Sequence, residues 1–379
     1  MKSGRYHVAF TKDWNDVPTC TTHILKQVAK NETVIWIESI GTRKPNLAAG
    51  RDLGRIWSRA KRIFKKAEKK TELLRVLSPV LIPLATRKWE LKVNQSLFRF
   101  YLWRESLLNR HTELVFWCFI PSAIDLIEPF SSKSKIVYYC VDDWPKFENL
   151  PTDYIEEREA NTLVNADSIF ATSLYLKNKC EDLSEKEVHY MPHGVPHRVF
   201  AKALKNANEQ LPFQKSDRKV VGFYGTINDW IDFDLIEELV IQNTDLDFYL
   251  LGPVYTDAPN RFLKYPNVHF PGRIEYEDLY KWCSFFDVAI IPYDLENPRM
   301  VSVNPVKARE ILSAGVPIVA SNLKDLECLK PDVLIAESRE DWNNFIREQI
   351  ERKDRQEISK RRVNDDWEQT TQKILEKIG

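Results

Sequence analysis

Short apolar runs alternate with amphipathic segments along most of this 379-residue chain. In the first half the apolar runs cover residues 6–10, 33–37, 114–117, 135–139, 168–171 and 188–191. After a polar stretch at 201–218 they begin again at 219–224, 248–252, 268–270, 288–291 and 317–320. Runs of this length between helical patterns predict parallel strands joined by helices. Because the alternation occurs twice, we expect two Rossmann-like α/β domains, with a linker in the polar stretch.

The stretch 304–321 predicts a helix followed by a buried strand. Asn304 is a favourable N-cap, and Pro305 suits the first helical position. Gly315 is expected to end the helix, and Pro317 prevents its continuation. The apolar run that follows, at 318–320, is typical of a central strand.

Lys307 and Glu310 are three residues apart, so they share one face near the start of this helix. Backbone N–H groups, the helix dipole and a lysine together attract phosphate. A carboxylate one turn further along can accept hydrogen bonds from the two hydroxyls of a ribose. The pair therefore predicts a nucleoside diphosphate site, although an ordinary amphipathic helix between two strands has the same spacing.

Composition narrows the class of protein. Lys plus Arg and Asp plus Glu both number 55, which disfavours a nucleic-acid partner. The six cysteines lack CxxC spacing, which is typical of buried thiols rather than of disulfides or a zinc site. No signal-peptide pattern and no run of 18 apolar residues is present. These features predict a cytoplasmic protein.

The segment 51–75 carries ten basic residues beside an apolar stripe at helical spacing. That combination is typical of a helix lying on an anionic lipid surface, although a solvated helix packed on the core would look similar. The residues we expect to contact the membrane are Arg55, Trp57, Arg59, Arg62, Phe64, Lys65 and Lys66. The predicted location is peripheral, on the inner face of the cell membrane.

The helix motif resembles the donor-nucleotide motif of GT-B glycosyltransferases, with the spacing Pro305-x-Lys307-x-x-Glu310 and then Ala314-Gly315-x-Pro317-x-Val319. The stretch 137–144 resembles the matching stretch of the bacterial surface-polysaccharide type (group 1, family 4-like), including teichuronic acid and xanthan glucuronosyltransferases. The resemblance implies an α/β GT-B fold, with two Rossmann-like domains facing across a cleft. We expect an acceptor domain at 1–205, a nucleotide-sugar domain at 206–355, and a helical segment at 356–379 that crosses back to the first domain.

The resemblance also implies further donor-binding residues. A glycine turn after the strand at 219–224 would bring the backbone of Gly225 and Thr226 close to a phosphate. Arg273 and Ile274 would lie beside the base, and Tyr293 would contact the phosphates or the sugar. Backbone donors are expected at Ser302 and Val303, with Lys307 on the pyrophosphate and Glu310 on the ribose.

The sequence departs from the resemblance at one informative position. Many retaining GT-B enzymes carry a second glutamate eight residues before the one that matches Glu310, and here Ser302 stands there. The basic residues that such enzymes place after the glycine turn are also absent from 226–232. Lys307, Arg299 or the helix terminus would then neutralise the pyrophosphate, and an inverting reaction is favoured.

Asp142 and Asp143 follow the strand at 135–139, at the edge of a parallel sheet where ligands bind. Adjacent carboxylates repel, which helps one of them to hold a proton and to act as a base. Asp142 is our candidate base. Asp143 is the alternative base or an acceptor contact. The remaining alternative is that the pair serves as an N-cap or is purely structural. The resemblance implies that Trp14 and His23 contribute to acceptor binding.

The sequence thus predicts a metal-independent, inverting hexosyltransferase without a cofactor. Its donor would be a nucleoside diphosphate sugar, with UDP favoured, and its acceptor a lipid-linked saccharide. A GT-B-fold nucleotide-sugar 2-epimerase and a non-catalytic nucleotide- or saccharide-binding protein remain the alternatives.

Overall fold

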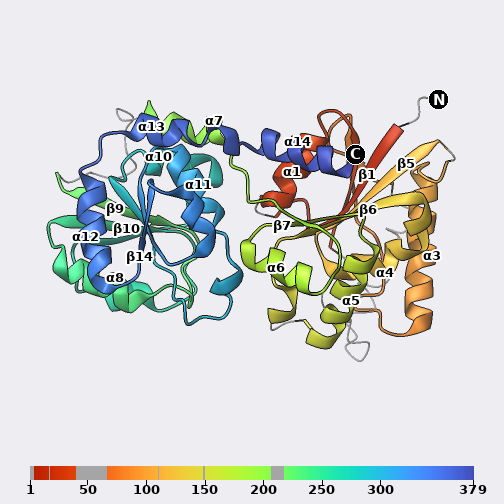
Figure 1. Cartoon of the computed structure of the whole chain (residues 1–379), viewed down its shortest axis with the longest axis horizontal. Helices are drawn as coiled ribbons and strands as arrows, with labels where there is room; N and C mark the ends of the chain where they lie inside the picture. The colour runs from red at the N-terminus through yellow and green to blue at the C-terminus, as the bar shows by residue number, and fades with distance from the viewer. Residues whose placement is uncertain (1–3, 17, 40–65, 110, 148–149, 206–216) are drawn as a thin grey trace. The chain divides into compact units, whose positions relative to one another are not determined.

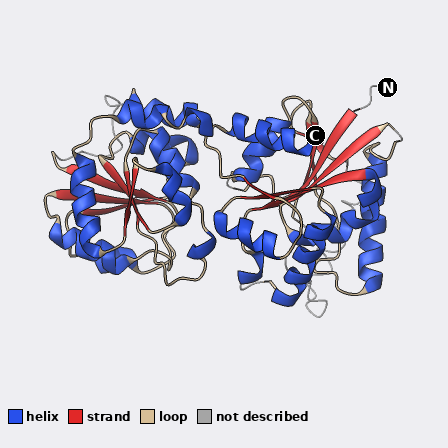
Figure 2. Ribbon diagram, in the orientation of Figure 1, coloured by secondary structure: helices blue, strands red, loops and turns tan. Residues whose placement is uncertain are grey.

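The computed structural model describes residues 4–16, 18–39, 66–109, 111–147, 150–205 and 217–379. It divides into two compact units (Figures 1 and 2). The first unit comprises Met1–Pro192 together with Thr371–Gly379, and the second comprises His193–Thr370. Each unit is built around a sheet with helices on both of its faces.

In the described part of the first unit, the sheet has eight strands in the order β3-β4-β2-β1-β5-β6-β7-β8. All neighbours are parallel except β3 and β4. The strands are β1 (Gly4–Phe10), β2 (Thr33–Ile37), β3 (Glu68–Lys69), β4 (Leu74–Leu77), β5 (Thr112–Cys118), β6 (Ser134–Cys140), β7 (Ser168–Ala171) and β8 (Val188–Tyr190). Their apolar side chains are buried because helices cover the sheet, as in other parallel sheets.

The described helices of the first unit connect successive strands. They are α1 (Cys20–Val28), α3 (Lys88–Arg104), α4 (Ile124–Ile127), α5 (Thr152–Asn165) and α6 (Leu174–Asp182). The end of α14 (Trp367–Ile378) also belongs to this unit. There, Lys135 donates to the backbone oxygens of Ile378 and Gly379, at 2.9 and 2.6 Å.

In the second unit the described sheet has six parallel strands in the order β11-β10-β9-β12-β13-β14. They are β9 (Lys219–Tyr224), β10 (Leu246–Leu251), β11 (Val268–Gly272), β12 (Val288–Ile291), β13 (Ile318–Ser321) and β14 (Val333–Ala336). The helices are α7 (His197–Phe200), α8 (Phe233–Gln242), α9 (Ala258–Phe262), α10 (Leu279–Cys283), α11 (Val306–Ser313), α12 (Arg339–Ile350), α13 (Arg355–Lys360) and the first residues of α14.

Every strand that the apolar runs predict is present, with ends shifted by at most a few residues. The strands β3, β4 and β14 were not predicted. The prediction of one helix over 51–75 is wrong for its described end, because residues 68–69 and 74–75 lie in β3 and β4. Lys66 is exposed and outside any helix, whereas Arg55, Trp57, Arg59, Arg62, Phe64 and Lys65 lie outside the described residues.

The division between the units differs from the predicted boundaries at 205 and 355. Residues 193–205 belong to the second unit, because Val195, Phe200 and Ala203 are part of its hydrophobic core. Residues 356–370 also belong to the second unit, where Ile358 is fully buried. Only Thr371–Gly379 returns to the first unit.

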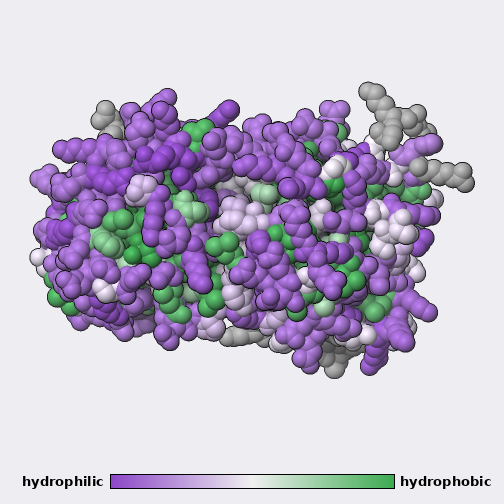
Figure 3. Space-filling model, viewed as in Figure 1, coloured by the Kyte–Doolittle hydropathy of each residue, from purple (hydrophilic) through white to green (hydrophobic). Residues whose placement is uncertain are grey.

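The surface that Figure 3 shows is mostly hydrophilic, with small hydrophobic patches. None of the helices in the described residues is both long and apolar enough to span a bilayer.

Candidate functional site

The donor-site candidates gather at one edge of the second unit's sheet. The strand order reverses between β9 and β12, because β10 and β11 continue on one side and β13 and β14 on the other. In open α/β sheets, ligands bind at the carboxyl ends of the strands beside such a reversal. Gly225 follows β9, Tyr293 follows β12, and α11 connects β12 to β13. The chain thus brings these residues to the place where this fold binds ligands.

Lys307 lies directly over the glycine turn. Gly225 has a φ of +141°, and a Cβ built on it would come within 2.2 Å of the Lys307 ammonium nitrogen. Glycine adopts this φ without strain, and a larger side chain at this position would displace the ammonium group from the turn. The same nitrogen lies 4.5 Å from the ring centroid of Phe223 and 5.4 Å from that of Tyr293, at cation–π distance. The turn therefore combines a close backbone approach with one positive charge.

Glu310 is almost completely buried, at 4% exposure. Its Oε2 accepts a hydrogen bond from the Tyr224 hydroxyl at 2.8 Å, and its Oε1 accepts one from Tyr276 at 2.6 Å. Burial raises the pKa of Glu310, while the two tyrosines and Lys307 oppose that rise. Burial and Glu310 in turn raise the pKa of Tyr276, so the tyrosine keeps its proton as a donor. Sequence reasoning missed both tyrosines, although Tyr224 ends a strand beside the glycine turn.

The start of α11 corrects part of the sequence interpretation. Pro305, not Asn304, is the N-cap, and the helix begins at Val306. Asn304 is buried and accepts a hydrogen bond from Arg309 at 3.0 Å, so it stabilises the base of the helix instead. Gly315 does end the helix region, with a φ of +76°.

Of the two expected backbone donors, Val303 is already engaged, and Ser302 uses its side chain within the same turn. The backbone N–H of Val303 donates to the Met300 carbonyl at 3.2 Å. It is therefore not the free donor that we predicted. The Ser302 hydroxyl donates to the Arg299 carbonyl at 3.1 Å. The Arg299 guanidinium itself is paired with both oxygens of Asp229. Lys307 is therefore the cation best placed over the turn.

The remaining donor-site candidates surround this group more loosely. Thr226 is half-buried immediately after Gly225. Ile274 is half-buried against the core, and Arg273 is exposed with its Nε 3.6 Å from Glu275. Tyr276, on the same loop, is the residue that reaches Glu310. The loop thus connects the predicted base-binding positions to the buried carboxylate.

In the first unit the two adjacent aspartates have different surroundings. Asp143 is buried and accepts from Lys179 at 2.7 Å and Tyr175 at 3.1 Å, and Lys146 lies 3.0 Å away. Although burial alone would raise the pKa of Asp143, Lys179 and Lys146 lower it below its usual value. Asp143 is therefore an ionised member of an ion-pair cluster.

Asp142 is half-buried, and no described side chain makes a hydrogen bond or an ion pair with its carboxylate. Burial and the neighbouring Asp143 raise the pKa of Asp142 to about 6. Its charge also acts on Cys20 at the start of α1, where burial and Asp142 raise the pKa of the thiol to about 12. Asp142 is thus a carboxylate that can take up a proton near neutral pH.

The acceptor-site candidates Trp14 and His23 lie in the segment that follows β1. The Trp14 ring meets Trp36 edge-on at 5.2 Å, and its backbone N–H donates to Glu38 at 3.1 Å. His23 is half-buried on α1. Trp14 is therefore fixed by β2 and its following loop, close to the carboxyl end of the sheet.

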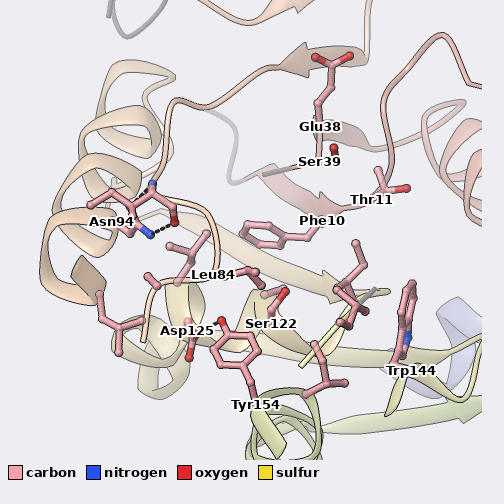
Figure 4. Close-up of a pocket in the computed structure, with 18 residues that line it drawn as sticks. Phe10, Thr11, Glu38, Ser39, Leu84, Asn94, Ser122, Asp125, Trp144 and Tyr154 are labelled. Carbon is pink, nitrogen blue, oxygen red and sulfur yellow. Dashed lines mark hydrogen bonds between the residues drawn. The ribbon is translucent and has the colours of Figure 1, made fainter. Parts of the chain in front are cut away.

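A largely apolar cavity of about 110 Å³ opens at the carboxyl ends of β1, β2 and β5. Figure 4 shows Phe10 and Leu84 near its centre and Trp144 at one side. At its base Asp125 accepts from the Tyr154 hydroxyl at 2.9 Å. Because Trp144 is two residues from Asp142, the loop that carries the candidate base also forms a wall of the cavity.

No group of three His, Cys, Asp or Glu side chains within the described ranges is arranged to hold a metal ion. His193 is also unsuited to ionise, since burial and Arg309 lower its pKa to about 3.

No protein-family model matches the sequence. A curated relative from Bacillus subtilis (strain 168), described as "Putative teichuronic acid biosynthesis glycosyltransferase TuaH", is 30% identical over 212 residues. The match covers 52% of this chain and 53% of the relative, so the chain spans about half the length of the relative that it matches.

Solved structures match over almost the whole chain. Sucrose-phosphate synthase from Thermosynechococcus elongatus has a TM-score of 0.67 at 13% identity and covers 98% of both chains. The UDP-forming α,α-trehalose-phosphate synthase from Burkholderia xenovorans has a TM-score of 0.69 at 12% identity, over 99% of this chain and 98% of its own. Anabaena HepE in complex with UDP and glucose gives 0.65 at 12% identity, over 98% of both chains. These likenesses show the fold: the chain has a GT-B-type α/β fold of two parallel-sheet domains.

Proposed function

We propose that this protein is a glycosyltransferase that moves a sugar from a UDP-sugar to a saccharide acceptor. The observation that carries the proposal is the position of Lys307 over the Gly225 turn, one helical turn from Glu310, at the strand-order reversal. The description of the B. subtilis relative as a glycosyltransferase supports it. The UDP named for two of the similar structures supports the choice of nucleotide.

In this proposal the donor binds to the second unit. Lys307 and the backbone at Gly225 and Thr226 hold the pyrophosphate, because a glycine turn and an ammonium group both attract oxyanions. Glu310 accepts the ribose hydroxyls, which replace the Tyr276 hydroxyl on Oε1. Arg273 and Ile274 border the base, and Tyr293 borders the phosphates or the sugar.

The transfer itself needs a base for the acceptor hydroxyl. Asp142 takes the proton as the acceptor oxygen forms its bond to the anomeric carbon of the sugar. The bond from that carbon to the diphosphate breaks, and the electron pair leaves with UDP. A single displacement of this kind inverts the anomeric centre. The unpaired Asp142, not the ion-paired Asp143, is suited to this role.

The acceptor that we propose is a lipid-linked saccharide of cell-surface polysaccharide synthesis. The support is the teichuronic acid pathway in the description of the relative. Trp14, His23 and the apolar cavity beside Asp142 would receive it in the first unit. No metal and no cofactor are required, because Lys307 supplies the positive charge for the leaving diphosphate.

A nucleotide screen followed by turnover assays tests the proposal. UDP at about 100 times its Kd should stabilise the protein by about 2.7 kcal/mol and raise Tm by several degrees. UDP-sugars incubated with lipid extracts should then release UDP and give a glycosylated lipid of inverted configuration. Nucleotide binding without UDP release would favour a binding protein, and a changed sugar nucleotide without acceptor would favour a 2-epimerase.

A further inference from the structure

The helix α3 has two apolar faces, of which its own unit covers one. Its buried face includes Phe98, Tyr101 and Leu102, which belong to the core of the first unit. The opposite side carries Trp89, Val93, Phe100 and Trp103, at intervals of four, seven and three residues. We call these four residues the α3 aromatic face. Such spacing places them on one stripe of a helix.

Three of the four residues of the α3 aromatic face are open to solvent, whereas Phe100 is half-buried against the core of the first unit. Trp89 is 56% exposed and Trp103 is 66% exposed, near the two ends of the 17-residue helix. Val93 is also exposed, and the rings of Phe100 and Trp103 lie 5.9 Å apart. Figure 1 shows α3, in orange, on the outside of the sheet of the first unit. Packing within the unit therefore gives no reason for two tryptophans here.

Basic side chains border the stripe. Lys92 and Arg99 follow one side of it and are exposed. On the other side Arg104 lies 5.8 Å from the Phe100 ring, but its side chain is largely buried and lies 3.7 Å from Glu105, so it adds no exposed charge. No ion pair joins Lys92 or Arg99 to an acidic residue in the described part of the chain. The only acidic side chain within α3 is Glu90, which is buried and accepts from the backbone of Thr86 and Arg87. The exposed side of the helix is therefore cationic.

A second cationic element joins the same helix at its end. The Ala67 backbone N–H donates to Glu105, directly after α3, at 3.1 Å, and Arg75 Nη1 lies 3.5 Å from the same carboxylate. Exposed Lys66 precedes Ala67. The described end of the basic segment is thus attached next to Trp103.

We propose that the α3 aromatic face docks the protein onto the surface of an anionic membrane. Tryptophan favours the boundary between lipid head groups and acyl chains, and flanking Lys and Arg are attracted by anionic head groups. A second copy on this face would bring like charges together, which disfavours a symmetric dimer. Because the net charge of the chain is zero, this attraction is local to the face. The biological reason for this docking rests on the proposed function, since a lipid-linked acceptor lies at such a surface. The structural evidence for the docking face does not depend on that function.

The test is co-sedimentation of the full chain with vesicles of phosphatidylcholine that contain 30% phosphatidylglycerol, at roughly physiological ionic strength. We expect binding to these vesicles and little binding to pure phosphatidylcholine. The double variant Trp89→Ser/Trp103→Ser should bind at least tenfold more weakly, and Lys92→Glu/Arg99→Glu should lose the preference for anionic lipid. The matched control Tyr255→Ser/Leu263→Ser, at exposed apolar positions of the second unit, should bind like the wild type.

Each other outcome overturns the inference. If the double variant binds vesicles like the wild type, the membrane contact lies elsewhere, for example in the basic segment. If the wild type does not bind and the double variant converts a dimer to a monomer, the face is an interface between copies. Circular dichroism verifies folding of each variant. UDP release on a soluble acceptor is measured in parallel, so failure of docking is separated from failure of the proposed function.

Discussion

The carboxyl edges of the two sheets differ in which charged group has a partner and which is left open. In the second unit the carboxylate Glu310 is buried under two tyrosine hydroxyls, and the ammonium of Lys307 stands over an open glycine turn. In the first unit the ammonium of Lys179 is bound to Asp143 and Glu159, and the carboxylate of Asp142 has no partner among the described residues. One edge thus presents a cation and the other a carboxylate that can accept a proton. A reaction that transfers a sugar away from a diphosphate to a hydroxyl needs one of each.

The largest expected effect comes from removing the base. Asp142→Asn should lower kcat on the order of 1,000-fold, since general base catalysis contributes about 100- to 10,000-fold. The Kd for UDP should not change, because the proposed donor site lies in the other unit. Steady-state kinetics and calorimetric titration measure the two quantities.

Asp143→Asn is the matched control for that comparison. It removes one partner from the cluster with Lys179 and Lys146, so it should lower Tm but leave kcat of the folded protein within a few-fold of wild type. The opposite result, with Asp143→Asn inactive and Asp142→Asn active, would exchange the roles of the two aspartates.

The next effect concerns the cation of the second unit. Lys307→Met should raise the Kd for UDP about 10- to 100-fold, because hydrogen bonds to charged groups contribute about 1.5–3 kcal/mol. Arg299→Met should change the Kd less than about threefold, since Asp229 already holds that guanidinium. Calorimetric titration compares the two variants, and a larger loss for Arg299→Met would reassign the pyrophosphate contact.

A smaller effect of opposite sign is expected at Tyr276. If the ribose replaces the Tyr276 hydroxyl on Glu310, then Tyr276→Phe removes a competitor. UDP should bind several-fold more tightly, since one neutral hydrogen bond is worth about 0.5–1.5 kcal/mol. Tyr280→Phe, on the neighbouring α10, should leave the Kd unchanged. Weaker binding by Tyr276→Phe would mean that the tyrosine stays on Glu310 in the complex.

The smallest expected effect is the contribution of Asp142 to the free energy of unfolding, which depends on pH. The pKa of Asp142 is about 6 in the folded chain, above the ordinary value of 3.8. Between those values the folded state binds more protons than the unfolded state, so stability falls as pH rises from about 4 to about 6. Full ionisation of Asp142 would lower the free energy of unfolding by about 3 kcal/mol. Because solvent surrounds part of this half-buried group, we expect a loss of only about 1 kcal/mol.

Urea unfolding at pH 4 and pH 7 measures this contribution. Asp142→Asn should be more stable than the wild type by about 1 kcal/mol at pH 7 and nearly equal to it at pH 4. A difference that is the same at both pH values would show that the carboxylate is not destabilised. For the same reason, kcat/KM of the wild type should fall below about pH 6, where Asp142 binds a proton.

The fold was largely predictable because buried parallel strands are continuous apolar runs. The strands missed were those whose residues break that rule. Strand β3 consists of Glu68 and Lys69, and β4 contains Arg75, so both were interpreted as part of a charged helix. Strand β14 is a short run at 333–336 that directly follows Pro331 and Asp332. The local composition of such short segments does not distinguish a strand from a charged helix or a loop.

The site was less predictable than the fold, because its contacts join distant parts of the sequence. Lys307 and Glu310 were evident from their helical spacing. The contact of Lys307 with Gly225 and that of Tyr276 with Glu310 depend on the strand order, which no local pattern contains. Similarly, Lys146 is three residues from Asp143, but Lys179 reaches it from another helix. The different roles of the adjacent aspartates follow from that second contact.

The return of Thr371–Gly379 to the first unit has a consequence for biosynthesis. The second unit is inserted between the main part of the first unit and its last segment. On the ribosome, domains usually fold in the order in which they emerge. Here Lys135 cannot reach the backbone of Ile378 and Gly379 until the second unit has been translated. The unit that begins first is therefore the one that is completed last.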